Sequence, residues 1–276
     1  MYELFLTAFV EDADISAACA VLSGLCGMPA WESLSRVLYF QGVGRPSGIS
    51  NQSSIERPLR KDVGIFWKDL HQSLSRQSFV LQARYEVQKD RDMGPQAQAA
   101  DLDSTAGVLR FTDFPDAPNA RPIVVQRKKV EIWEQKKLPS ILRDNNYQFK
   151  TETVEEMLRF FRDELEFTLT RHYFTHPISA YQPLATKSQP TVPLSTLPAW
   201  EDLTPMDSQR RWVLQIKTHV LQDTRPDEVR RGQEALLAVM EDLSGVFEFK
   251  VIDRKVHDTR AVLPHARQDP AMLKKK

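Results

Sequence analysis

The chain has 276 residues, of which 41% are hydrophobic. This is enough to bury a sizeable core, in one large β domain or in two ordinary domains. Lysine plus arginine and aspartate plus glutamate each number 37, and the resulting formal charge of zero argues against a partner held mainly by a phosphate backbone or an anionic membrane surface. The apolar start is too short for a membrane span and lacks the features of a signal peptide, so we expect an intracellular soluble protein.

The chain opens with a predicted strand followed by a predicted helix. Residues 2–10 alternate between an apolar face and a more polar one, which indicates extended backbone. Apolar residues then recur at helical spacing over 13–26. Cys19 and Cys26 fall in this helix about two turns (~10 Å) apart, so they cannot pair with each other and we expect reduced thiols.

The middle of the chain carries several further segments with a period of two. Each indicates a strand with one buried face. The polar stretch 89–104 lacks periodicity and is typical of a disordered insertion. The predicted strands are 35–41, 79–87, 108–111, 123–135 and 147–152, with helices near 67–74 and from Pro139; beyond 152 the pattern fits strand or helix.

The stretch 161–174 is the longest uninterrupted alternation, and it predicts one long strand. Leu165, Phe167 and Leu169 share its apolar face and are therefore predicted core residues. After a proline-rich loop the chain continues with a strand at 212–221, a helix over 228–243 introduced by Thr224 and Asp227, and a last strand at 247–251.

These elements predict an α+β, mainly β fold. At least seven alternating strands indicate an antiparallel sheet, and closure removes exposed edges, so we expect a closed or nearly closed antiparallel β-barrel with flanking helices. A single barrel domain is predicted over 1–262, with disordered insertions at about 42–62, 89–105 and 176–208. Residues 263–276 are predicted to form a flexible C-terminal tail.

Several long stretches carry a family resemblance, among them MYELFLTAFVEDAD, KKVEIWEQKKLPSILRDNNYQFKTE and FFRDELEFTLTRHYF. The chain resembles the family of Mediator of RNA polymerase II transcription subunit 18, in its fungal form. The resemblance implies a nuclear, non-enzymatic barrel in the Mediator head module, paired with subunit 20 and tethered by a C-terminal helix of subunit 8. It also implies a barrel related in shape to the triphosphate tunnel metalloenzymes.

An enzyme or binder of phosphorylated ligands is therefore the main alternative function. Tunnel enzymes need alternating glutamates, ExExK, on an early strand to hold a metal. Here Glu3 is followed by Phe5 and Thr7 in the next two positions of that face. We expect no catalytic residue, no metal site and no cofactor.

Charged residues also appear on the polar faces of other strands. Their alternation with apolar residues is interpreted as solvated outer faces of the barrel. A third class, a nucleic-acid module, would require a basic stripe with aromatics, for which only the short segment 126–133 qualifies. The charged positions are Arg84, Glu86, Lys129, Glu131, Lys150, Glu152, Lys217, Glu248 and Lys250.

Four aromatic residues share faces with polar neighbours and are the candidate partner-binding residues: Phe5, Phe9, Trp133 and Phe174. Two explanations remain open. The helices at 13–26 and 228–243 could cover these side chains, or they could form a groove for a partner helix or a subunit interface, where aromatic anchors are enriched. Trp133 is the strongest candidate.

Overall fold

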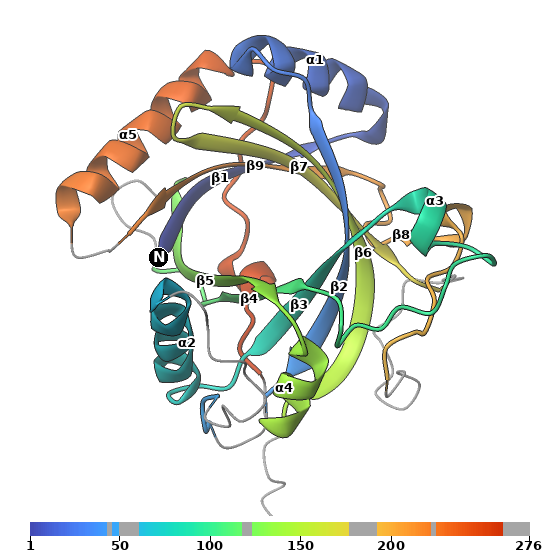
Figure 1. Ribbon diagram of the computed structural model, residues 1–276. Coiled ribbons are helices and arrows are strands. Elements are labelled where there is room, and N and C mark those ends of the chain that lie inside the picture. The colour runs from blue at the N-terminus through green and yellow to red at the C-terminus, as the bar shows by residue number, and fades with distance from the viewer. Residues whose placement is uncertain (43–45, 50–60, 118–122, 177–191, 222–224, 262–276) are drawn as a thin grey trace, which may run out of the picture.

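Eight antiparallel strands close into a barrel, and a two-residue ninth strand extends it (Figure 1). The computed structural model describes residues 1–42, 46–49, 61–117, 123–176, 192–221 and 225–261. The strands follow the order β6-β2-β3-β4-β5-β1-β9-β7-β8, and an additional pairing between β6 and β7 closes the ring. The predicted fold class is confirmed.

The strands of the described chain are β1 (Tyr2–Val10), β2 (Trp31–Gln41), β3 (Val80–Val87), β4 (Gly107–Thr112), β5 (Val125–Gln135), β6 (Gln148–Arg162), β7 (Leu165–Phe174), β8 (Thr204–Pro205) and β9 (Trp212–Val220). The helices are α1 (Ile15–Cys26), α2 (Lys61–Leu74), α3 (Lys89–Asp92), α4 (Leu138–Asp144) and α5 (Pro226–Asp242), with short 3-10 turns η1 (Asp12–Asp14), η3 (Trp200–Asp202) and η4 (Arg254–His257). None of the described helices has the length and apolar content needed to cross a bilayer.

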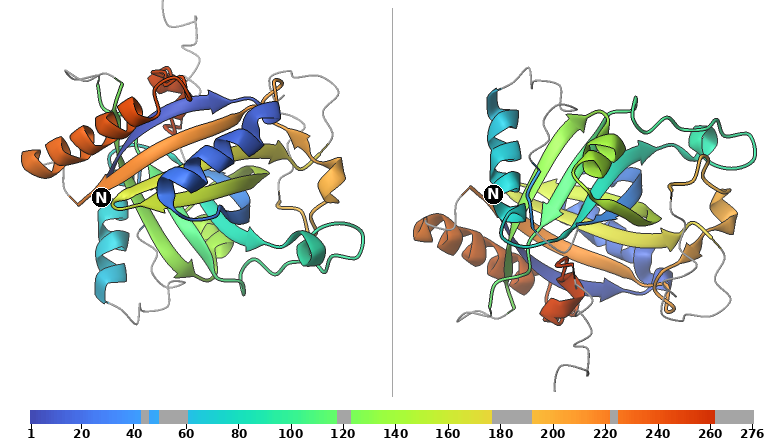
Figure 2. Two further views of the ribbon diagram at one scale, coloured as in Figure 1. Left: turned by 90° about the horizontal axis from the view of Figure 1, so that it is seen from above. Right: turned by 90° about the horizontal axis from the view of Figure 1, so that it is seen from below.

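The hydrophobic core lies outside the barrel wall, between the strands and the helices. One cluster packs β1, β7 and β9 against α1 and α5; it contains the predicted core residues Leu165, Phe167 and Leu169. A second cluster packs β2, β3, β4 and β5 against α2 and α4. Figures 1 and 2 show the two helix pairs on opposite sides of the barrel. The apolar face of each strand therefore points outward, under a helix.

The segment 161–174, predicted as one long strand, contains the last residues of β6, a tight turn and the whole of β7. β6 continues to Arg162, the chain reverses at Asp163, and β7 begins at Leu165. Asp163 has a φ of 53°, a left-handed conformation that short polar side chains tolerate in turns. The ambiguous stretch after residue 152 is strand throughout, because β2 and β7 hydrogen-bond to β6 from its two sides.

The segment 247–251 was predicted as a last strand, and this is wrong. It forms one isolated bridge, between Phe249 and Ala8. Ala8 pairs with Leu214 of β9 on one side. On the other side, where β5 pairs only with Tyr2–Phe5, the segment adds this bridge and a hydrogen bond from Lys250 N to Thr7 O at 2.9 Å, which is too little for a ladder. The helix before this segment begins at Pro226 without a side-chain cap, and Thr224 lies outside the described residues.

The polar segment 89–105 was expected to be disordered from its composition. The structure gives it α3 and a turn in which Asp101 accepts hydrogen bonds from the residues that follow it. Asp103 then accepts bonds from the Ser140 amide and hydroxyl at 3.2 and 2.7 Å and so holds the start of α4. Much of 42–62 and 176–208 and all of 263–276 lie outside the described residues, and the predicted domain limits stay a prediction.

Candidate functional site

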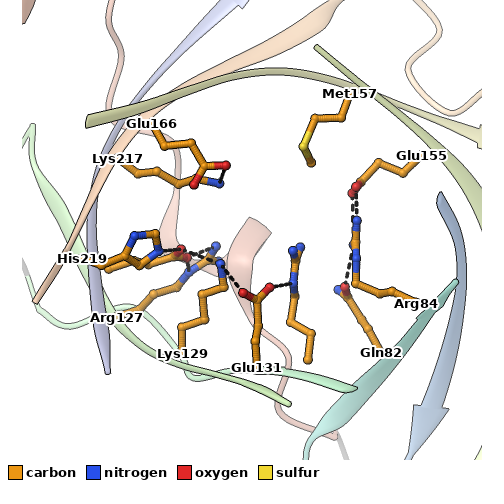
Figure 3. A network of polar contacts seen from close by, with 12 residues as sticks. Gln82, Arg84, Arg127, Lys129, Glu131, Glu155, Met157, Glu166, Lys217 and His219 are labelled. Atoms are coloured by element: carbon orange, nitrogen blue, oxygen red, sulfur yellow. Dashed lines mark hydrogen bonds and ion pairs between the residues drawn. The ribbon is translucent and has the colours of Figure 1, made fainter. Parts of the chain in front are cut away.

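The barrel lumen is lined by charged side chains. Arg84, Lys129, Glu131 and Lys217 point toward the barrel centre from β3, β5 and β9 (Figure 3). The interpretation that these four residues lie on solvated outer faces is therefore wrong. Helices cover the outside of the barrel wall, so the apolar faces of the strands point outward and pack against them. The polar faces therefore point into the lumen.

Glu3 and Glu131 organise one side of the lumen. Arg127 Nε donates to Glu3 at 2.5 Å, and Arg110 Nε donates to Glu131 at 2.5 Å. Lys129 lies between the two carboxylates, 3.5 Å from Glu3 and 3.3 Å from Glu131. Burial alone would raise both pKa values. The neighbouring cations outweigh this effect, and they lower the pKa of Glu131 to about 2 and hold that of Glu3 well below its usual value.

A second pair lies on the opposite side of the lumen, between β3 and β6. Arg84 forms a two-bond ion pair with Glu155 and also donates to Gln82 at 3.2 Å. The Nε2 atom of His172 lies 3.5 Å from the same carboxylate. Burial opposes ionisation of Glu155, but Arg84 outweighs it and lowers the pKa of Glu155. Burial also lowers the pKa of His172, so this imidazole is neutral at pH 7.

A third group of charges surrounds Glu166 of β7, which forms ion pairs with both Arg159 and Lys217. Its carboxylate lies 3.1 Å from Arg159 and 3.4 Å from Lys217. Burial, reinforced by the charge of Lys129, lowers the pKa of Lys217 to about 8. The Lys217 ammonium therefore loses its proton more readily than an exposed lysine does.

The charged walls enclose a cavity of about 470 Å³. The C-terminal segment 256–259, red in Figure 1, forms part of its lining. This segment is fixed by hydrogen bonds from Val80 N to Thr259 O at 2.6 Å and from Thr259 Oγ1 to Thr112 O at 2.5 Å. The ring of His257 packs edge-on against Phe5 at 5.6 Å, and burial followed by the charge of Arg127 lowers its pKa to about 4.

The lumen does not present a set of free carboxylates. Phe5 occupies the lumen-facing position two residues after Glu3, with the Arg127 guanidinium 4.9 Å from its ring centre. The lumen glutamates described above are each bound to arginine or lysine. Among the described residues, no group of three or more His, Cys, Asp and Glu side chains is placed to hold a metal ion. The arrangement suits structural ion pairing and the binding of anions.

The comparisons with known proteins identify the family. The family described as Med18 protein matches residues 2–260. The chain belongs to the Med18 family. Its sequence is 23% identical over 281 residues to Mediator of RNA polymerase II transcription subunit 18 of Aspergillus niger, covering 95% of this chain and 100% of the relative. The subunit of the same name from Aspergillus fumigatus is 22% identical over 278 residues, with the same coverage.

The Med18 fold is also seen in a solved structure. A chain from the structure of the Schizosaccharomyces pombe Mediator head module aligns with a TM-score of 0.59 and 14% sequence identity. The alignment covers 91% of this chain and 98% of that chain. The Med18 barrel with flanking helices is thus shared at the level of the fold.

The four candidate partner-binding residues of this Med18 chain do not form one surface. Phe5 is 0% exposed, inside the lumen, so the expectation of an uncovered side chain is wrong for it. Phe9 and Trp133 are 37% and 57% exposed, and Phe174 is partly buried with its ring 5.8 Å from His176. The helices α1 and α5 cover the opposite face of β1, so the covering explanation also fails for Phe5 and Phe9.

The strand register shows that the exposed candidates Phe9 and Trp133 lie at opposite ends of the Med18 barrel. β5 pairs with β1 from Tyr2↔Lys128 to Phe5↔Val125, so residues of β5 beyond Lys128 run past the N-terminal end of β1. Trp133 therefore lies at that end, whereas Phe9 lies at the other. Sequence reasoning missed the lumen cations, although the recurrence of charge on strand after strand was their signal.

Proposed function

We propose that this chain is a non-enzymatic scaffold subunit of the Mediator head module that acts through protein contacts in transcription initiation by RNA polymerase II. The observation that carries this proposal is the family match over residues 2–260. Relatives of matching length are named as Mediator subunit 18, and a chain of the Mediator head module has the same fold. As a subunit of this complex, the chain would act in the nucleus.

The finer part of the proposal concerns the partners. We expect a heterodimer with Mediator subunit 20 and a tether formed by the C-terminal helix of Mediator subunit 8. The lumen is lined by ion pairs among its own side chains, so we expect these partners to contact the outer surface and the barrel ends. The exposed ring of Trp133 at the end of β5 supports that end as one contact.

Co-expression of the full chain with subunits 20 and 8 from the same organism tests the proposal. All three should co-elute from a size-exclusion column at a constant ratio. A chain that elutes alone, although folded by circular dichroism, would contradict it. The same purified chain, given inorganic triphosphate and Mg²⁺ or Mn²⁺, should release no phosphate; turnover that disappears in Glu3→Gln would also contradict it.

A further inference from the structure

The lumen contains more cations than carboxylates. Among the described strand residues that face it, six carry a positive charge and four a negative charge, and the three histidines nearby have lowered pKa values. A buried charge without a partner is costly. The cations are Arg84, Arg110, Arg127, Lys129, Arg159 and Lys217, and the carboxylates are Glu3, Glu131, Glu155 and Glu166.

The excess of positive charge in the lumen is associated with the two lysines, Lys129 and Lys217. Lys129 shares Glu3 with Arg127 and shares Glu131 with Arg110, so neither carboxylate belongs to it alone. Lys217 shares Glu166 with Arg159 in the same way. Both lysines are buried, and each repels the other strongly enough to contribute to the low pKa of Lys217. Two positive charges in the lumen therefore lack a counter-charge of their own.

The cavity lined by Lys217 can hold a small molecule. Its volume of about 470 Å³ lies within the range of roughly 300–1,000 Å³ usual for ligand pockets. Arg127 and Lys217 line it together with the polar side chains of Thr168 and Gln215.

Two lining histidines add further polar groups to the cavity. The atoms His172 Nδ1 and His257 Nε2 are buried and have no hydrogen-bond partner among the residues that the structure describes. Buried polar atoms are normally hydrogen-bonded, so these nitrogens are positions where a ligand can be contacted. Asp258, also in the lining, is already bound by Arg260 at 2.7 Å and does not offset the excess.

We propose that the barrel lumen binds a small polyanion with at least two negative charges, of the size of pyrophosphate, and that Lys217 and Arg127, which line the cavity, are its main contacts. Such a ligand supplies the counter-charge that the shared carboxylates do not. A cation would add to the excess, and a neutral molecule would leave both lysine charges uncompensated. The site is a binding site and requires no hydrolysis.

Calorimetric titration of the full chain with sodium pyrophosphate at pH 7, without added metal, tests the proposal. Sodium chloride of equal ionic strength is the reference. Wild type should bind pyrophosphate, and Lys217→Met should bind it about 10- to 100-fold more weakly, since a hydrogen bond to a charged group is lost. Lys250→Met removes the same charge from an exposed side chain outside the lumen and should bind like wild type.

A melting measurement separates loss of binding from loss of folding. Without ligand, Lys217→Met should melt no lower than wild type, because Glu166 keeps Arg159 and the repulsion from Lys129 disappears. Pyrophosphate should raise the melting temperature of wild type and Lys250→Met but not that of Lys217→Met.

The pH dependence gives an independent outcome. Lys217 is faced by Lys129, Arg110, Glu166 and Glu3, and among these groups Lys217 is the one that loses its proton near pH 8. The ratio of the wild-type affinity to the Lys217→Met affinity should therefore fall as the pH rises from 7 to 9; this ratio cancels the effect of pyrophosphate itself, which also loses protons over this range. No binding by wild type, or equal binding by wild type and Lys217→Met, would overturn the proposal, whether or not the chain assembles with Mediator subunits.

Discussion

Glu131 stabilises the barrel through its negative charge and the hydrogen bond that it accepts from Arg110, since its carboxylate lies among cations in the lumen. We expect Glu131→Gln to cost about 3 kcal/mol at pH 7, because Arg110 and Lys129 lose a counter-charge in a buried site. A carboxyl with a lowered folded pKa stabilises the fold above its unfolded pKa, and this contribution is lost as the pH falls through the folded pKa. With a folded pKa of about 2, the stability difference should be complete at pH 5 and shrink toward pH 2.

Urea unfolding of wild type and Glu131→Gln between pH 2 and 7 checks this dependence. Glu248→Gln is the control, because its side chain is exposed and paired only with exposed Lys250; it should change stability by less than about 0.5 kcal/mol. A difference between wild type and Glu131→Gln that stays constant down to pH 2 would show that the carboxylate is not held by its cations.

Phe167 tests the placement of the core outside the barrel wall. Its side chain is 0% exposed in the cluster between β7 and the helices α1 and α5. Phe167→Ala should cost about 3–5 kcal/mol, the range for large-to-small changes in a core. Phe161→Ala is the matched control, as Phe161 is 39% exposed and its truncation should cost much less. A loss under about 1 kcal/mol for Phe167→Ala in chemical unfolding would be incompatible with a packed outer face.

At the scale of elements, two helical glycines distinguish close packing from free surface. A Cβ at Gly232 of α5 would lie 3.0 Å from the Thr218 methyl group of β9, whereas a Cβ at Gly24 of α1 would meet nothing within 4 Å. Leucine favours a helix over glycine by about 1 kcal/mol. Gly24→Leu should therefore stabilise the chain, and Gly232→Leu should destabilise it by pushing α5 off the sheet. Melting temperatures of the two variants check this; equal shifts would mean that α5 does not depend on close approach.

The strands could largely be predicted from the sequence, but the direction of their faces could not. A period of two reveals that β1 has an apolar and a polar face; it does not say whether apolar Leu6 or polar Thr7 points inward. That choice depends on which face the helices cover, and this is a property of the tertiary structure. The fate of Phe5 follows from the same choice, since it lies on the lumen face.

Turns and isolated segments were harder to predict for a related reason. The reversal at Asp163 needs a single residue in a left-handed conformation, and alternation continues across it. The segment 247–251 alternates like a strand, yet it meets β1 only at the Phe249–Ala8 bridge and one adjacent hydrogen bond, because alternation does not determine how far two segments run side by side. The family resemblance, by contrast, rested on long stretches and reached the same family as the comparison over residues 2–260.

At the scale of the whole molecule, exposed Trp133 is the candidate contact for a partner subunit. We expect Trp133→Ala to lower the stability of the free chain by less than about 1 kcal/mol and to weaken co-purification with subunit 8 or subunit 20, since buried tryptophan at an interface can contribute ~2 kcal/mol or more. Thermal unfolding beside a pull-down measures both effects. Trp31→Ala removes a similarly exposed ring and should leave capture unchanged; unchanged capture by Trp133→Ala would remove Trp133 from the interface.

The position of β1 between β5 and β9 has a consequence for how the chain is made. The first strand to be synthesised pairs with the last, from Tyr2↔Val220 to Val10↔Trp212. At a synthesis rate of about 5–20 residues per second, β1 waits ~10–40 s on the ribosome for this partner. During that time one edge of β1 and its apolar residues stay uncovered, so nascent chains are exposed to aggregation until almost the whole sequence has emerged. Protection of β1 during synthesis should therefore raise the yield of folded subunit.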